Sequence, residues 1–308
     1  MTLMPRGLDG RLRLTDAGIE TVLLFDEGFD LPSFAAFPLL DDPTGRAALA
    51  AYARSFLELA GSHGAGFVLE TPTWRANPSW GLGLGYDAES LRRIAFDAVE
   101  SARALVAETG ADDVLVSGCV GPRGDGYVPG DVMTADEAAA YHRRQVTDLA
   151  DAGADLVTSF TFPYAAEGVG FATAAAQAGI PAVVGFTVET DGRLPSGESL
   201  AAAIGAVDEA TGGYPAWFMV NCAHPEHVRP ALDRGEDWVA RIGALRANAS
   251  RRSHAELDEA ETLDSGDPQE LADDCVELRD LLPGLGVVGG CCGTDLRHVA
   301  QLADRLLV

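Results

Sequence analysis

Lysine is absent from this sequence of 308 residues, and all 22 basic side chains are arginines. Enzymes that form a Schiff base with their substrate, or that anchor pyridoxal phosphate, use the amine of a lysine. Both kinds of chemistry are therefore excluded. Positive charge is also scarce overall, because 47 acidic residues leave a formal net charge of −25. That charge argues against nucleic acids and acidic membranes as partners.

The sequence also lacks a long apolar run, and its N-terminal residues do not show a basic segment followed by an apolar one. We therefore expect a soluble protein of the cytoplasm. The five cysteines show no paired spacing, and the cytosol keeps thiols reduced, so we expect no disulfide framework. Two roles remain for the thiols, which are core packing and metal or redox chemistry.

Short apolar runs alternate with longer segments of helical periodicity along the whole chain. Eight runs are predicted strands, namely Arg11–Leu14, Gly66–Glu70, Asp113–Gly118, Asp155–Phe160, Ala182–Val188, Trp217–Asn221, Arg241–Ala247 and Gly286–Gly290. The predicted helices are Pro43–Ser62, Glu89–Glu108, Ala135–Ala152, Ala165–Ala178, Leu200–Ala210, Pro225–Arg234, Pro268–Leu282 and Asp295–Leu307.

This alternation predicts an α/β fold in which residues 1–308 form one (β/α)8 TIM barrel domain. A doubly wound sheet would need a glycine-rich phosphate loop after the first strand, and LTDAGIET is a poor match to one. The acidic segment Ser253–Pro268, which follows the seventh strand, is long for a strand-to-helix connection. We expect an insertion there, forming an extra helix or a lid on the rim, with solvated carboxylates.

Three cysteines follow predicted strands, at the end where the strands of a barrel form a common mouth. Cys222 comes after the sixth strand, and Cys291 and Cys292 come after the eighth. Three thiolates form a tetrahedral zinc site with one open position, and sulfur ligands favour zinc over magnesium or calcium. An open position is typical of a catalytic zinc site.

Glycines and a helix start frame the adjacent cysteine pair. Gly289 and Gly290 leave space for two consecutive residues to turn inward, and Gly293 allows the backbone to swing into the last helix. Thr294 or Asp295 is expected to cap that helix, whose N-terminal dipole would offset part of the thiolate charge.

The competing interpretation treats cysteines as small buried residues, or Cys291 and Cys292 as a vicinal disulfide. Packing is the expected role of Cys275, which lies inside a predicted helix. Cys119 follows the third strand, where it could line the pocket, although packing is favoured there too.

The histidines are not expected to bind the metal. His224 and His227 lie close to Cys222, but Pro225 starts a helix that should turn both side chains away. The remaining histidines are expected at the surface or in packing, and they are His63, His142, His254 and His298.

The hexapeptide GGCCGT with an upstream NC resembles the zinc-dependent homocysteine S-methyltransferase family, which includes betaine-dependent enzymes and the homocysteine-binding half of cobalamin-dependent methionine synthase. Similar segments cover nearly the whole chain, and they are Asp16–Gly18, Glu70–Trp74, Gly118–Gly124, Gly185–Leu200 and Arg246–Ser250. The resemblance implies a TIM barrel in which Cys222, Cys291 and Cys292 hold zinc and homocysteine sulfur fills the fourth position.

The implied reaction makes methionine from homocysteine. A thiol on zinc loses its proton near neutral pH, and its sulfur then attacks a methyl group on a sulfonium or ammonium centre. Because 308 residues leave no room for a cobalamin or folate domain, the donor must be a free molecule. By resemblance it is S-methylmethionine, S-adenosylmethionine or betaine.

Two segments depart from the family pattern. The first-strand motif, usually aspartate and two glycines, is here Asp16, Ala17 and Gly18, so Asp16 can still contact the homocysteine amino group. In the fourth strand a Glu-Thr pair is replaced by Phe160 and Thr161, which removes the carboxylate that would bind that amino group. Either another acid, such as Glu70 or Glu167, binds the amino group instead, or the acceptor is a different thiol or a selenol.

Further substrate contacts are expected from Glu70, Thr71 and Trp74 after the second strand. The rings of Trp74, Trp80 and Phe34 could face the methyl cation, with packing at the rim as the alternative role. Asn221, next to Cys222, could orient the thiolates.

A non-catalytic interpretation is that the cysteines form a structural zinc site or a redox-active vicinal disulfide. A structural zinc site needs a fourth protein ligand, and none is evident in the sequence. The sequence leaves the oligomeric state open, because it shows no heptad pattern or large apolar stripe.

Overall fold

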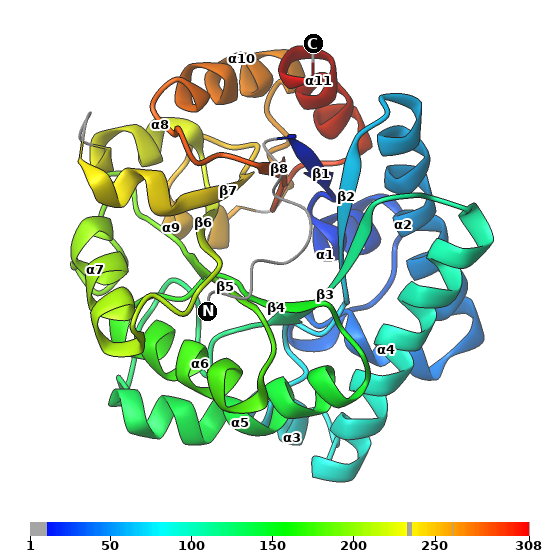
Figure 1. The fold of residues 1–308 in the computed structure, drawn as a ribbon. Helices are drawn as coiled ribbons and strands as arrows, with labels where there is room; N and C mark the ends of the chain where they lie inside the picture. The colour runs from blue at the N-terminus through cyan, green and yellow to red at the C-terminus, as the bar shows by residue number, and fades with distance from the viewer. Residues whose placement is uncertain (1–10, 233–235, 261, 308) are drawn as a thin grey trace.

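Eight parallel strands close into a barrel in this computed structural model, which describes residues 11–232, 236–260 and 262–307. Neighbours in the barrel are neighbours in the chain, and β8 pairs with β1 (Figure 1). The strands are β1 (Arg13–Thr15), β2 (Gly66–Glu70), β3 (Val114–Val120), β4 (Leu156–Ser159), β5 (Ala182–Phe186), β6 (Trp217–Ala223), β7 (Ile242–Ala247) and β8 (Val287–Gly290). The predicted TIM barrel fold is confirmed.

Helices surround the strands, most of them in an outer layer and the short ones after β1 and β7 at the mouth of the barrel (Figure 1). They are α1 (Ile19–Thr21), α2 (Pro43–Ser62), α3 (Pro78–Gly83), α4 (Ala88–Thr109), α5 (Ala135–Asp151), α6 (Ala165–Ala178), α7 (Leu200–Thr211), α8 (Pro225–Val228), α9 (His254–Asp258), α10 (Pro268–Arg279) and α11 (Leu296–Leu306). Local signals set their ends. Asp42 accepts a hydrogen bond from the Gly45 N–H at the start of α2, and Gly110 and Gly179 end α4 and α6 with left-handed backbone. No described helix is long and apolar enough to span a membrane.

Most predicted boundaries differ from the observed ones by a few residues, and two differences affect the site. β3 and β6 continue further than predicted, so Cys119 and Cys222 lie within strands rather than after them. The predicted helix Pro225–Arg234 is wrong in length, because α8 ends at Val228 and a 3-10 turn holding Pro230 follows. Residues 233–235, which include the predicted end of that helix, lie outside the described residues, as does Glu261.

The apolar core has two main layers. Side chains such as Leu156, Val183 and Met219 fill the inside of the barrel, and a larger cluster packs between the strands and the helices. Side chains alternate between these layers along each strand, so most strands are apolar on both faces, whereas β1 places Arg13 and Thr15 on one of its faces. The filled interior closes the barrel below its mouth, and a pocket opens at the C-terminal ends of the strands.

The connection from β1 to α2 folds over the mouth. It carries a third apolar cluster, which includes Leu23, Phe37 and Leu40 and extends to Ile94 of α4. Ser33 and Phe34 both have left-handed backbone, with φ of 57° and 55°. Left-handed backbone is uncommon for residues other than glycine, and here it turns the chain at the edge of the pocket.

Candidate active site

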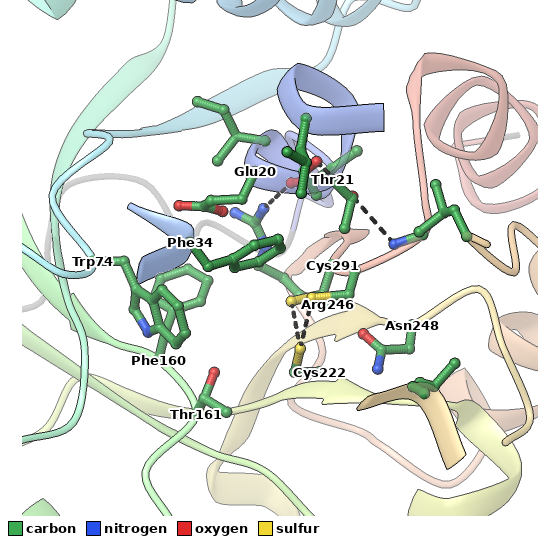
Figure 2. A pocket seen from close by; sticks show the side chains of 18 of the residues that line it. Glu20, Thr21, Phe34, Trp74, Phe160, Thr161, Cys222, Arg246, Asn248 and Cys291 are labelled. Carbon is green, nitrogen blue, oxygen red and sulfur yellow. Dashed lines mark hydrogen bonds between the residues drawn. The ribbon is translucent and has the colours of Figure 1, made fainter. Parts of the chain in front are cut away.

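The three cysteines after or within β6 and β8 come together at the mouth of the barrel. The Cys222 sulfur lies 3.1 Å from that of Cys291 and 3.4 Å from that of Cys292. The three sulfur atoms all lie within 4.8 Å of one another. In Figure 2 the sulfur atoms of Cys222 and Cys291 face each other across a short gap. Strands distant in sequence therefore bring the three predicted thiols to one place.

A β-bulge aims the side chain of Cys222. In the pairing of β6 with β7, Asn221 lies opposite Arg246 and Ala223 lies opposite Ala247, so Cys222 is the extra residue. Its φ is 56°, in the left-handed region. A bulge of this kind changes the direction of one side chain without ending the strand. Backbone strain at a functional position is a recurring feature of binding and catalytic sites.

Glycines make the space that Cys291 needs. A Cβ at Gly18 would lie 2.5 Å from the carbonyl oxygen of Cys291, and one at Gly289 would lie 2.5 Å from Thr15 Cγ2. A Cβ at Gly290 would collide with the side chain of Thr294. Close approach of the β1 and β8 ends therefore requires glycine at Gly18 and Gly289, and the turn after β8 requires it at Gly290.

The turn after the cysteine pair has the predicted form. Gly293 has a φ of 77°, which lets the backbone reverse into α11. Asp295, rather than Thr294, caps the helix and accepts a hydrogen bond from the Arg297 N–H at 2.8 Å. The Thr294 hydroxyl instead donates to the Cys291 carbonyl oxygen at 2.7 Å.

Contact among the three thiols shifts their pKa values in opposite directions. Hydrogen bonds from Cys291 and Cys292 lower the pKa of Cys222 well below its usual value. Its thiolate in turn raises the pKa of Cys291 to about 12 and that of Cys292 above the usual range. Three thiolates cannot form together in so small a volume unless a cation neutralises them. The donor set therefore fits a soft divalent metal such as zinc.

Two residues that the sequence did not single out surround Cys222. The Tyr127 hydroxyl lies 2.8 Å from the Cys222 sulfur, and its ring stacks on the His254 ring at 3.8 Å. His254 bonds to the Cys222 carbonyl oxygen at 2.7 Å and to Glu189 at 2.9 Å. His254 was expected in packing or at the surface, and it is a buried residue of the pocket lining.

A buried ion pair joins β1 and β7 beside the thiols. Arg246 lies 2.6 Å from Asp16, and it also donates to the Thr15 hydroxyl and to the carbonyl oxygens of Ala17 and Gly290. Burial alone would lower the pKa of Arg246, but attraction to Asp16, Cys291 and Glu70 raises it. Burial raises the pKa of Asp16, and the pairing with Arg246 opposes that effect. Asp16 is therefore already engaged by a guanidinium.

The carboxyl group of Glu70 has a free oxygen in this pocket. Its Oε2 is buried without a hydrogen-bond partner, and Glu70 lines the pocket. Burial raises the pKa of Glu70 to about 7, against the opposing effect of Arg246. The other acid suggested by the sequence, Glu167, does not face the pocket. It accepts from the Arg123 N–H at 2.8 Å and pairs with His142 at 3.1 Å, so this suggestion is wrong.

Phe160, Thr161 and Thr71 all line the pocket, and the guanidinium carbon of Arg246 lies 5.0 Å from the Phe160 ring centroid. Asn221 does not contact the thiols as suggested. Its amide oxygen accepts from the Thr161 N–H at 2.9 Å, and its amide nitrogen donates to the Thr161 hydroxyl at 3.0 Å. Asn221 thus fixes Thr161, whose φ is 60°.

The aromatic residues divide into two groups. Phe34 and Trp74 line the pocket, and Figure 2 shows them with Phe160 on one side of the sulfur atoms. Trp80 is not among the lining residues, contrary to the expectation that it faces the donor. The guanidinium of Arg75 lies over both indoles, 3.9 Å from the Trp74 centroid and 3.7 Å from the Trp80 centroid.

The other thiols and histidines have separate roles. Cys119 lines the pocket, whereas Cys275 is buried in the core on α10, as predicted. His224 caps α8 and His227 bonds to the Arg251 carbonyl oxygen at 3.0 Å. Among the described residues, the cluster able to hold a metal contains the three cysteines and neither of these histidines.

The pocket at the mouth has a volume of about 480 Å³, which suits a small ligand. Strand ends supply its floor, and the connections after β1, β2, β3 and β7 supply its sides. Glu20, which follows β1, also lines it, and burial raises the pKa of Glu20 to about 7. The connection after β7 contributes α9 and Leu263 to the lining.

A family model described as homocysteine S-methyltransferase matches residues 13–306. The chain belongs to this family. It is therefore an enzyme of the homocysteine methyltransferase family, with a cysteine triad able to bind zinc. This membership favours catalysis over the non-catalytic interpretation of the cysteines.

Two curated relatives are named as methyltransferases. The chain is 29% identical to the homocysteine S-methyltransferase of Escherichia coli (strain K12) over 256 residues, which is 76% of this chain and 78% of that protein. It is 26% identical to the selenocysteine Se-methyltransferase of Brassica oleracea var. italica over 205 residues, 63% of this chain and 58% of that protein.

Solved structures of the Escherichia coli homocysteine methyltransferase MmuM have the same fold. The oxidized form aligns with a TM-score of 0.76 and the metallated form with 0.74, each at 24% identity. The first alignment covers 98% of this chain and 99% of that chain, and the second covers 96% of each. This chain therefore shares the overall fold of that protein.

Proposed function

We propose that this protein is a zinc-dependent S-methyltransferase that converts homocysteine to methionine with a free methyl donor. One observation carries the proposal, which is a cluster of three thiols at the mouth without a fourth cysteine, histidine or carboxylate ligand among the described residues. A site with three protein ligands leaves one position for a substrate atom. The family assignment supports homocysteine sulfur as that atom.

Cys222, Cys291 and Cys292 would hold the zinc ion. Zinc on three thiolates would supply a positive centre that keeps the acceptor sulfur deprotonated near neutral pH. The chain's own contribution is to fix the three sulfur atoms, through the bulge at Cys222 and the glycines around Cys291. Cys222 is also held by Tyr127, whose hydroxyl contacts its sulfur, and by His254, which bonds to its carbonyl oxygen.

We propose that Glu70 binds the ammonium group of homocysteine. Its free Oε2 and the unpartnered Oδ1 of Asn248 are both acceptors, and both residues line the pocket. An ammonium group donates three hydrogen bonds and would satisfy both atoms. Asp16, paired with Arg246, would contribute negative charge nearby, so the acid lost at Phe160 is replaced from β2. Gly18, Thr71, Trp74, Thr161 and Asn221 would shape or support this substrate site.

The reaction is a direct displacement. The acceptor sulfur forms a bond to the methyl carbon, the bond between that carbon and the onium sulfur or nitrogen breaks, and the thiol proton leaves to solvent. S-methylmethionine, S-adenosylmethionine and betaine all carry such a methyl group. The leaving group departs with a neutral sulfur or nitrogen atom and needs no proton. In agreement, the lining residues include no serine nucleophile paired with a histidine base as in serine hydrolases.

A different thiol or a selenol is the second candidate acceptor. Phe160 motivates it, because an apolar ring lies where the family pattern has a carboxylate, and one curated relative bears the name selenocysteine Se-methyltransferase. An acceptor profile separates the candidates. Homocysteine as the best acceptor supports the first proposal, and turnover with another thiol or a selenol but not with homocysteine supports the second.

We also propose that residues 1–308 act as one domain and that the acidic segment Ser253–Pro268 is an insertion that covers one side of the pocket. Leu257, Leu263 and Asp264 of this segment line the pocket. His254 anchors it to β6 through the Cys222 carbonyl oxygen. Several of its carboxylates are exposed, including those of Glu256 and Glu259, in keeping with a solvated outer face.

The deciding experiment measures zinc content and methionine formation in parallel. The wild-type protein is expected to hold about one zinc ion per chain and to form methionine from homocysteine and S-methylmethionine. Cys291→Ala should lose both properties. Cys275→Ala is the matched control, because it removes a buried thiol away from the site and should keep both. A wild-type protein without zinc would contradict the mechanism.

A further inference from the structure

The side chain of Arg75 combines deep burial with an incomplete set of partners. It follows β2, is 6% exposed and lines the pocket. Nη1 donates to the Gly124 carbonyl oxygen at 3.0 Å, and Nε is buried without a partner. A guanidinium has five N–H donors, so most of its hydrogen-bonding capacity is unused within the described chain.

No carboxylate of the described residues forms an ion pair with Arg75. Asp125 is the acid with the largest electrostatic effect on Arg75, and its Oδ1 accepts from the N–H groups of Tyr127 and Val128. Burial therefore lowers the pKa of Arg75 to about 10, with only partial opposition from Asp125. Arg246, buried in the same pocket, shows the opposite shift because Asp16 neutralises it. A buried cation without a counter-ion is costly unless a ligand supplies one.

The surroundings of Arg75 restrict the shape of that ligand. Trp74 and Trp80 cover the guanidinium through their rings, so a ligand can approach only along its edge. The edge of a guanidinium matches the two oxygens of a carboxylate, which it binds with parallel hydrogen bonds. The indoles also fix the orientation of the guanidinium plane, which favours a carboxylate that lies in that plane.

The place of Arg75 assigns it to the donor rather than to the acceptor. The thiols and the free oxygen of Glu70 are on or beside strand ends, whereas Arg75 is five residues beyond the end of β2. The donor must approach the acceptor sulfur from the side away from the three cysteines. It therefore occupies the part of the pocket lined by the connections after the strands, which include Phe34, Trp74 and Arg75.

We propose that Arg75 binds the carboxylate of the methyl donor, so that the enzyme takes onium donors bearing a carboxylate and discriminates against onium compounds without one. This inference rests on the proposed methyltransferase function. An unpaired guanidinium repels a simple cation. A donor that carries both an onium centre and a carboxylate removes this repulsion and satisfies the free N–H groups.

Ligand binding tests the proposal without requiring turnover. S-methylmethionine and (3-aminopropyl)dimethylsulfonium differ only in the carboxylate, so calorimetric titration of zinc-loaded protein with each measures its contribution. Wild-type protein should bind S-methylmethionine about 10- to 100-fold more tightly, as expected for hydrogen bonds to a charged group. Arg75→Gln should reduce that ratio to about 1. Arg75→Lys, which keeps the charge but not the planar fork, should retain part of it.

A matched control and kinetics complete the test. Arg54→Gln removes an arginine from an exposed pair with Glu108 and should keep the wild-type ratio. In turnover, Arg75→Gln should raise KM for the donor and leave KM for the acceptor unchanged. An unchanged binding ratio in both Arg75 variants would overturn the proposal, and so would an increase confined to the acceptor KM. Failure of methyl transfer with the binding ratio intact would instead contradict the proposed function alone.

Discussion

Two walls of the same pocket differ in how their polar groups are satisfied. The strand wall consists of Asp16, Cys222, Arg246, Cys291 and Cys292, which lie in or next to β1, β6, β7 and β8. The loop wall consists of Phe34, Trp74, Arg75, Tyr127 and His254, which lie in the connections after β1, β2, β3 and β7. In the strand wall the guanidinium is ion-paired, and in the loop wall it is not.

The difference separates two tasks. Groups of the strand wall hold one another in fixed positions, as a reaction centre requires. Arg75 in the loop wall has hydrogen-bonding capacity left over, which is what a group that selects a substrate needs. Connections of a barrel can change without disturbing the strands, so relatives can share the reaction and differ in the molecules they accept.

The largest effect is expected from breaking the strand wall at Cys222. Cys222→Ala removes one of three metal ligands and should reduce kcat/KM by roughly 10³-fold or more, because the metal centre supplies several kcal/mol of the barrier reduction. Elemental analysis should show loss of zinc. Cys119→Ala removes a thiol that lines the same pocket outside the cluster, and its zinc content should be normal. Retention of zinc by Cys222→Ala would contradict the assignment.

The next effect tests the ion pair of the strand wall. Asp16→Asn leaves Arg246 buried without its counter-ion and should lower the free energy of unfolding by about 3–5 kcal/mol. Urea denaturation measures this change. The control Asp41→Asn breaks the exposed pair with Arg93 and should cost about 1 kcal/mol or less. Equal losses in the two variants would mean that the strand wall is not specially stabilised by its charges.

A pH experiment tests the effect of the buried carboxyl group of Glu70 on stability. Glu70 has its pKa raised from 4.5 to about 7 by burial, so the folded state binds more protons than the unfolded state between these values. Stability is therefore highest below about pH 4.5 with respect to this group and falls as the pH rises to about 7, by on the order of 3 kcal/mol. Glu70→Gln should fall less over this range. Superimposable pH curves for the two proteins would argue against this effect.

The smallest effect is expected at the loop wall near the thiols. Tyr127→Phe removes the hydroxyl that lies 2.8 Å from the Cys222 sulfur and should weaken zinc binding by about 10-fold, as for other groups that support metal ligands. Competition with a chelator measures the affinity. Tyr141→Phe, whose hydroxyl bonds to Asn77 instead, should leave it unchanged. An identical zinc affinity in the Tyr127 variant would show that this contact does not support the metal site.

The same division explains what the sequence could predict. Periodicity predicts the barrel, and the rule that strand ends converge predicts the meeting of Cys222, Cys291 and Cys292. Tyr127 and His254 escape such reasoning because the paths of long connections decide where they lie. The sequence does carry a signal for Arg246, since a charged residue inside the apolar run IGALRA has to be paired. The orientation of Asn221 depends on a bulge that no local pattern reveals.

The pairing of β8 with β1 has a consequence for folding. The metal cluster takes one thiol from β6 and two from the segment after β8, and Gly18 packs against Cys291 across the junction of the first and last strands. A growing chain cannot assemble this cluster until nearly all of its residues have been synthesised. Zinc bound at the cluster would thus stabilise the closed barrel and not partly folded forms that lack β8. Metal uptake would report the moment at which the barrel is complete.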